Sequence, residues 1–307
     1  MNNQFIPIRL STLQPDIPLG FLLLLKVNNQ YIKYILPEDP IDKPRYENLR
    51  SKKVKKVYIQ SKDERLYQRF IDKCLNFDEN SDVQEMTRVV AGIAADSIES
   101  IYAEPDSMYA LAHSEKAANS ILNATKLNPE VLKELFNLES EDDISINCAI
   151  CTCSTAIALA RYIKLDEELV KNIATASLLC DISLPRLHAN YQTFFTKELS
   201  DFTEEELQAY KEHPTRSAEF LQSIPGINSI VLGIIANHEE KISGKGFPRG
   251  TKKLTMEEKI VSLSNRYALS IIGHKIPKEQ VFKDLFINEI GSYDLELMNI
   301  LKKLLEA

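Results

Sequence analysis

The chain of 307 residues is poor in long apolar runs and in cysteine, and each scarcity excludes a class of protein. No apolar run approaches the roughly 20 residues that span a bilayer, so we expect no membrane insertion. The start, MNNQFIPIRL, lacks a charged segment followed by a long apolar one and predicts no signal peptide. Five cysteines are an odd number in a long chain and do not indicate a disulfide framework. Together these absences predict a cytoplasmic location.

Positive charge is also in short supply. The chain has 37 lysines and arginines against 44 acidic residues, which gives a net charge of −7. Such a balance argues against the binding of a nucleic-acid polymer. A small anion could still bind at a local basic patch.

Glycine is scarce as well, but it is not evenly spread. Of the nine glycines, Gly244, Gly246 and Gly250 lie within seven residues of one another. They belong to the segment NHEEKISGKGFPRG, residues 237–250, which places His238 at the end of an apolar helical run and then opens a loop. Glycines so close together indicate a backbone held in a special shape, as in a loop that approaches a ligand. We therefore expect functional residues to converge on this segment.

Residues 1–78 predict a small α+β domain. Four segments have strand character, at 5–10, 21–27, 31–35 and 54–60. Helices are expected at 45–53 and from 61 to about 75. Because no catalytic constellation occurs here, we interpret this part as an accessory or sensor domain.

Residues 79–307 follow helical spacing almost to the end. Apolar residues recur at helical intervals from Val89 to Tyr102. The segment 146–163 is small and apolar throughout, which is typical of a helix buried on all sides. The sequence therefore predicts a mainly α protein, with an all-helical C-terminal domain behind the small N-terminal one.

Several segments of this helical part resemble a known family. Cys180-Asp181 ends a buried helix, HPTRSAEFLQSIPG begins at His213, HEEKISGKGFPRG begins at His238, and residues 260–265 lie on a later helix. In order and spacing they resemble the HD-GYP family, bacterial phosphodiesterases that hydrolyse cyclic di-GMP. The resemblance covers roughly residues 90–275 and implies an HD-GYP-like helical bundle.

That family uses two or three metal ions, held by histidines and aspartates, to polarise the phosphate and generate hydroxide from water. The resemblance implies that three ligands remain in this chain, Asp181, His213 and His238. The other ligand positions hold further candidate donors, namely Cys148 (less readily Asn147), Cys180, Asn237 and Asn265. The lysine that follows the HD pair falls at Leu184, and the loop aspartate and tyrosine fall at Ser243 and Phe247.

This ligand set predicts a single divalent ion of iron, manganese or zinc, or none, and no two-metal cluster. The cysteines allow two interpretations. Cys148 and Cys180 either fill space vacated by histidines, or they form a thiolate metal site together with Asp181.

Basic and aromatic residues surround the glycine loop, and we predict a ligand-binding role for Lys241, Lys245, Phe247 and Arg249. The charges are either simply solvated or form a rim that attracts a dianionic nucleotide. Phe247 keeps a flat face on which a guanine could stack.

The loss of several members of one catalytic unit predicts a catalytically degenerate HD-GYP-like signalling protein, which binds cyclic di-GMP or a protein partner. The alternative is an active, metal-dependent cyclic di-GMP phosphodiesterase with an altered or mononuclear metal site. A third candidate is a scaffold without a small ligand. We assign no residue a catalytic role.

Overall fold

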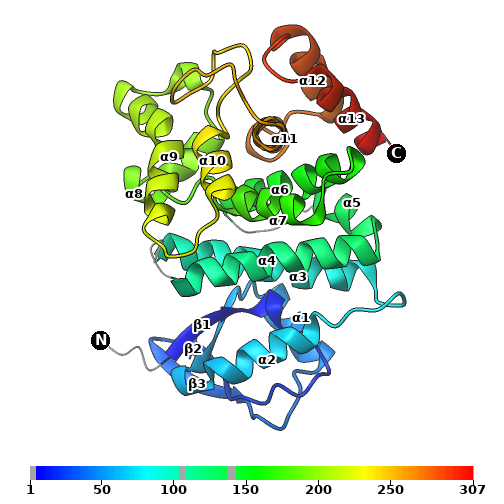
Figure 1. Cartoon of the computed structure of the whole chain (residues 1–307). Coiled ribbons are helices and arrows are strands. Elements are labelled where there is room, and N and C mark those ends of the chain that lie inside the picture. The colour runs from blue at the N-terminus through cyan, green and yellow to red at the C-terminus, as the bar shows by residue number, and fades with distance from the viewer. Residues whose placement is uncertain (1–4, 104–107, 137–142, 307) are drawn as a thin grey trace. The chain divides into compact units, whose positions relative to one another are not determined.

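The computed structural model describes residues 5–103, 108–136 and 143–306, and it is mainly helical with one small sheet (Figure 1). Its contacts divide the chain into two compact units, Met1–Asp96 and Ser97–Ala307. The predicted fold class, a mainly α protein with a small N-terminal α+β part, is confirmed. The predicted domain boundary at residue 78 stays a prediction, because helix α3 (Val83–Ala103) continues across the division at residue 96.

The first unit contains a four-stranded antiparallel sheet and two helices. The strands lie in the order β1-β4-β2-β3. Their bounds are β1 (Phe5–Arg9), β2 (Leu23–Val27), β3 (Gln30–Ile35) and β4 (Lys56–Gln60), with α1 (Lys43–Ser51) and α2 (Glu64–Cys74). The β2–β3 hairpin turns at Asn28 and Asn29, both at positive φ, a conformation that asparagine tolerates better than most residues.

The core of this unit lies between one face of the sheet and α2. Alternate strand residues such as Val57 and Ile59 are fully buried, and α2 contributes Tyr67 and Phe70. Phe21 meets both aromatic rings edge to face, with centroids 5.9 and 5.7 Å away. The unit is therefore a small domain with its own core, as the alternating strand pattern predicts.

The second unit is built from helices. Their bounds are α4 (Met108–Leu127), α5 (Glu130–Phe136), α6 (Ile144–Tyr162), α7 (Glu167–Leu179), α8 (Leu184–Leu187), α9 (Glu204–Gln222), α10 (Ser229–Asn237), α11 (Met256–Ala268), α12 (Lys278–Lys283) and α13 (Leu295–Glu306). Short 3-10 segments are η3 (Tyr191–Phe195) and η4 (Leu199–Asp201), and π-helical segments are η5 (Leu269–Gly273) and η6 (Asp284–Asn288).

Helix α6 is the centre of this unit. It packs against α7 and α11, and every side chain from Ser145 to Ala160 is buried. The hydroxyl of Ser154 is satisfied within the helix, where its Oγ donates to the carbonyl of Ile150 at 3.0 Å. Among the described residues, α6 alone has the length and hydropathy of a membrane span, but 89% of that stretch is buried inside the protein. This is the environment of a core helix, as the small-residue pattern predicts.

Candidate functional site

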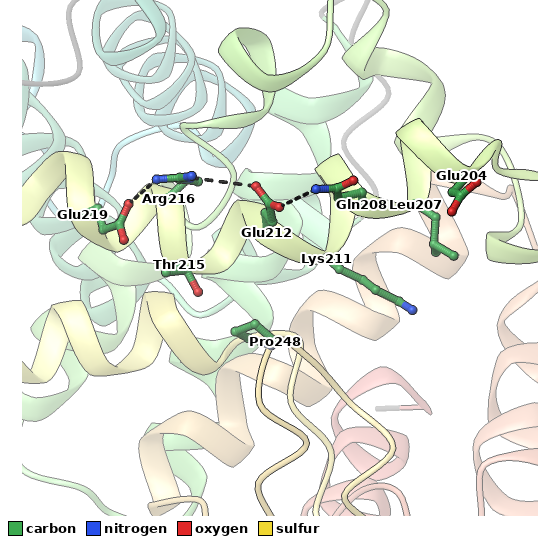
Figure 2. Close-up of a pocket in the computed structure, with 9 residues that line it drawn as sticks. All are labelled: Glu204, Leu207, Gln208, Lys211, Glu212, Thr215, Arg216, Glu219 and Pro248. Atoms are coloured by element: carbon green, nitrogen blue, oxygen red, sulfur yellow. Dashed lines mark hydrogen bonds and ion pairs between the residues drawn. The ribbon is translucent and has the colours of Figure 1, made fainter.

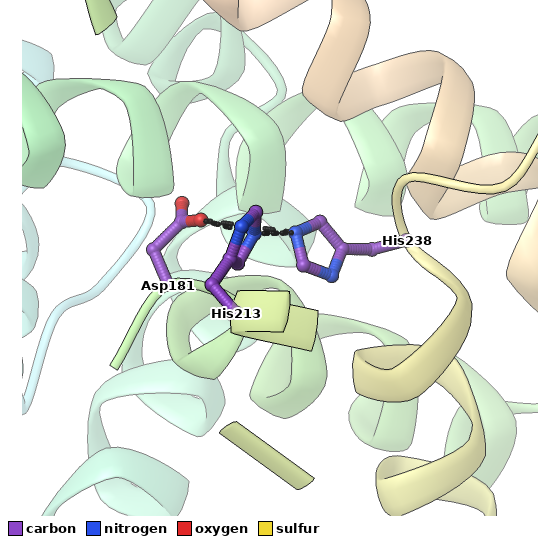
Figure 3. Close-up of side chains that lie close together, drawn as sticks. All are labelled: Asp181, His213 and His238. Atoms are coloured by element: carbon purple, nitrogen blue, oxygen red, sulfur yellow. Dashed lines mark hydrogen bonds and ion pairs between the residues drawn. The ribbon is translucent and has the colours of Figure 1, made fainter. Parts of the chain in front are cut away.

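Three side chains from three separate elements meet inside the second unit (Figure 3). Asp181 follows α7, His213 lies within α9, and His238 caps the end of α10. His213 Nε2 lies 2.9 Å from His238 Nε2 and 3.2 Å from Asp181 Oδ1, and His238 Nε2 lies 3.7 Å from the same oxygen. All three are buried, and one ligand atom from each falls within 4.8 Å of the others. The three residues that the sequence predicts as metal ligands are thus brought together.

The orientation of His213 follows from the proline after it. Pro214 has no N–H, so the carbonyl of Tyr210, four residues earlier, has no helical donor. His213 Nδ1 lies 2.5 Å from that carbonyl oxygen. Because a carbonyl can only accept, Nδ1 carries the hydrogen and Nε2 directs a lone pair into the site.

His238 is fixed in the same way by a helix end. Its Nδ1 donates to the carbonyl of Ile235 at 2.7 Å, in the last turn of α10, where carbonyls lack helical partners. The Nε2 atoms of His213 and His238 therefore face each other beside a carboxylate, where each can hold a proton or a metal ion. Such an arrangement requires a cation or a shared proton between them. Two imidazole nitrogens and one carboxylate oxygen fit a single iron, manganese or zinc ion.

The electrostatics of these groups favour positive charge at the same place. Burial by itself raises the pKa of Asp181, but hydrogen bonds and charge from His213 and His238 outweigh it and hold the pKa below its usual range. Burial lowers the pKa of His238, but Cys180 and Asp181 outweigh burial and raise the pKa well above its usual value. Binding of a metal ion here would compete with protonation of His238.

Asn237, a further candidate donor, does not face the three ligands. Its Nδ2 donates to Glu258 Oε1 at 2.5 Å, and its Oδ1 accepts from the guanidinium of Arg249. Both ends of the amide are therefore committed to α11 and to the glycine loop. A metal-binding role for Asn237 has no support in this geometry.

The two cysteines near the site are buried thiols. Cys148 packs in an apolar cluster with Leu184, Phe194, Phe195 and Tyr210. Cys180 donates its S–H to the carbonyl of Ala176 at 3.1 Å. Burial raises the pKa of Cys148 and of Cys180, so neither is poised to ionise. Among the residues that the structure describes, the candidate ligand group contains neither of them. The geometry favours the space-filling interpretation over a thiolate site.

Asn265, the last candidate donor, contacts a carboxylate instead. Its Nδ2 donates to Glu239 Oε1 at 3.0 Å, and the hydroxyl of Tyr210 donates to the same oxygen at 2.8 Å. Neither Tyr210 nor Glu239 is among the residues that the sequence predicts for the site. Tyr210 lies three residues before His213, and that helical spacing, which puts both on one face of α9, was the available signal.

The glycine loop is shaped by a second carboxylate. Glu240 is fully buried and accepts from the backbone N–H of Arg249 at 2.7 Å and of Thr251 at 3.0 Å. Gly246 passes so close to the start of the loop that a Cβ there would lie 2.3 Å from the nitrogen of Lys241. The special backbone shape that the glycines predict is present, and Glu240 holds it.

The four predicted ligand-binding residues separate into two groups. Lys241 pairs with Glu289 at 2.7 Å, and Arg249 bonds Asn237, so both are engaged within the protein. Phe247 packs against Tyr210 and His213 with ring centroids 5.5 and 6.5 Å away, and Lys245 is exposed. Only Phe247 and Lys245 keep the placement that a ligand rim requires, and their role stays a prediction.

A surface groove of about 570 Å³ runs along the outer side of α9 (Figure 2). Its lining consists of Glu204, Leu207, Gln208, Lys211, Glu212, Thr215, Arg216, Glu219 and Pro248. The charges pair among themselves, as where Arg216 meets Glu219 at 3.0 Å. None of the three candidate metal ligands lines this groove, so it is separate from the buried site.

Comparisons with known proteins agree on one relationship. A protein-family model described as "HD domain" matches residues 130–280. The cyclic di-GMP phosphodiesterase PA4108 of Pseudomonas aeruginosa is 25% identical over 175 residues, which are 56% of this chain and 40% of that relative. This chain therefore spans about two fifths of the curated relative that it matches. The solved structure of Bd1817, a HDG"Y"P protein from Bdellovibrio bacteriovorus, matches with a TM-score of 0.80 and 25% identity over 99% of this chain and 100% of that one.

Proposed function

The chain belongs to the HD-GYP family of HD-domain proteins, and from that premise we propose that it is a catalytically degenerate signalling module with a single-ion site. The observation that carries the proposal is the composition of the buried site. One carboxylate and two imidazoles converge there, on Asp181, His213 and His238. A cytoplasmic location stays a prediction from the sequence.

The residues around the three ligands support the absence of a two-metal clamp. Cys148 and Leu184 are buried in an apolar cluster, and Asn265 is hydrogen-bonded to Glu239. A two-metal site stabilises both the attacking and the leaving oxygen of a phosphate, which needs bridging carboxylates and more donors than three. The three ligands suffice for one ion. The lack of donors for a second ion favours a binding role over hydrolysis.

His213 and His238 would hold the ion through Nε2, with their tautomers already fixed by backbone carbonyls, and Asp181 would supply an oxygen. When bound, a divalent ion there supplies positive charge and Lewis acidity to a water or a phosphate oxygen. The chain itself contributes a preorganised, buried donor set, so little reorganisation is needed on binding.

The test combines metal analysis with a hydrolysis assay on the full chain. Protein loaded with iron(II), manganese or zinc and then desalted should carry at most one ion per chain and should release no product from cyclic di-GMP. His238→Ala should lose the ion, because two ligands bind weakly, while the exposed control Lys245→Ala should keep it. Two or more ions per chain together with product formation would establish an active phosphodiesterase instead.

We further propose that this protein binds either cyclic di-GMP or a partner protein. The relative from P. aeruginosa acts on that nucleotide, and Phe247 beside the exposed Lys245 offers a ring and a positive charge near the site. Titration calorimetry with cyclic di-GMP separates the two versions. If no binding is detected at high micromolar nucleotide, the chain is not a cyclic di-GMP receptor, and the role of binding a protein partner remains. Binding that Phe247→Ala weakens and Lys211→Ala does not would establish the receptor.

A further inference from the structure

Glu239 is a carboxylate beside the single-ion site that accepts hydrogen bonds from neutral groups. It follows His238 directly and is partly buried. Both contacts to its Oε1 come from neutral donors, the Tyr210 hydroxyl at 2.8 Å and the Asn265 amide at 3.0 Å. Within the described parts of the chain, it forms no ion pair. A partly buried carboxylate without a counter-charge is unusual and needs such donors to remain there.

The two donors come from elements that also build the single-ion site. Tyr210 lies on the same face of α9 as His213, and their rings are 5.0 Å apart. Tyr210 is buried among aromatic rings, including Phe194 and Phe247, so its hydroxyl is held in place. Asn265 lies on α11 and is also buried, at 8% exposure. Glu239 therefore sits in a rigid frame next to the three ligands.

The polarity of the Asn265 contact decides what this frame can bind. A carboxylate only accepts, so Asn265 must turn its Nδ2 toward Glu239. An N–H group repels a cation, whereas an aspartate of the same shape would offer a second oxygen at that point. Two carboxylate oxygens so close together would form the oxygen-rich environment that manganese or magnesium prefers.

We propose that Tyr210 and Asn265 close a second cation position at Glu239, and that the residue at 265 sets whether the chain binds one metal ion or two. The inference rests on the proposed function for the first ion, which Asp181, His213 and His238 would hold. The Tyr210 hydroxyl and the Asn265 amide both direct hydrogen atoms at Glu239, and neither supplies an oxygen ligand for a second ion there.

The experiment converts the amide into the isosteric acid. Asn265→Asp, alone and together with Tyr210→Phe, should raise bound manganese from one to two ions per chain, measured by elemental analysis after desalting. Electron paramagnetic resonance should change from the signal of an isolated manganese(II) to that of an exchange-coupled pair, which only adjacent ions give. Wild-type protein should show one ion and the isolated signal.

A matched control is available in the same unit. Asn172 is a buried helical asparagine, 7% exposed, that accepts from Asn228 at 3.2 Å. Asn172→Asp makes the same chemical change away from the site and should leave one ion per chain. Circular dichroism of each variant checks that the fold is kept, and the single Asn265→Asp variant serves if the double variant does not fold.

The outcomes separate this inference from the proposed function. One ion in both wild type and Asn265→Asp would overturn the inference and leave the single-ion site standing. Two ions already present in wild type, or none in either protein, would overturn the single-ion site and the inference with it. A second ion that also appears in Asn172→Asp would show surface binding and overturn the inference alone.

Discussion

Replacement of Glu240 should disturb the glycine loop more than any nearby surface change. One of its carboxylate oxygens accepts from the N–H of Arg249 at 2.7 Å and the other from Thr251 at 3.0 Å, in a fully buried position. Glu240→Gln keeps the size but leaves one acceptor oxygen, so an amide N–H then faces a backbone N–H. A hydrogen bond to a charged group contributes about 1.5–3 kcal/mol, and a buried unsatisfied donor costs about 1–3 kcal/mol. We expect the loop to lose about 3 kcal/mol of local stability.

The assay is hydrogen–deuterium exchange followed by mass spectrometry on peptides covering residues 241–251. A loss of about 3 kcal/mol corresponds to exchange roughly 100-fold faster at the affected amides. Glu219→Gln is the matched control, because Glu219 is half exposed and pairs with Arg216 on the outer face of α9. That variant should change stability by about 0.5 kcal/mol or less and leave loop exchange unaltered. Exchange in Glu240→Gln within about threefold of wild type would refute the role given to this carboxylate.

Three further predictions concern other sites. Gly246→Ala would place a Cβ 2.3 Å from the nitrogen of Lys241, and we expect a loss of about 3 kcal/mol in thermal unfolding; an unchanged Tm would contradict this. Burial lowers the pKa of His113 from 6.5 to about 4, so stability should be full above pH 6.5 and fall by about 3 kcal/mol towards pH 4, a dependence that His113→Gln should remove. Burial raises the pKa of Glu289, but Arg266 and Lys241 outweigh it and lower the pKa below 4.5. Glu289→Gln should therefore lower the Tm at pH 7, and the difference from wild type should shrink as the pH falls from 4.5 through the lowered pKa.

The elements of the fold were readable from the sequence because their signals are local. Alternation predicted a strand at 54–60 where β4 spans Lys56–Gln60, and small apolar spacing predicted a helix at 146–163 where α6 spans Ile144–Tyr162. The strand order was not readable, because β1 pairs with β4, the last strand in the chain, and that choice depends on packing between distant segments.

The residue types of the candidate site could be predicted from the sequence, but the contacts between those residues could not. Asp181, His213 and His238 were identified through the family resemblance, and their convergence agrees with it. Asn237 was included because it falls at a ligand position of the family, but successive residues of a helix point about 100° apart, so its amide bonds Glu258 on α11. The hydrogen bonds to Glu239 join α9, α11 and the end of α10, and no local pattern could reveal a contact of that kind.

The complete burial of α6 has a consequence for how the chain folds during its synthesis. One of the two helices that cover it most extensively is α7, which follows at once, while the other is α11, which begins almost a hundred residues after α6 ends. At a synthesis rate of about 5–20 residues per second, an apolar surface of α6 stays uncovered for at least several seconds before α11 leaves the ribosome. During that interval the nascent chain is a client for chaperones. Slower translation through residues 163–268 should prolong this exposure and increase aggregation.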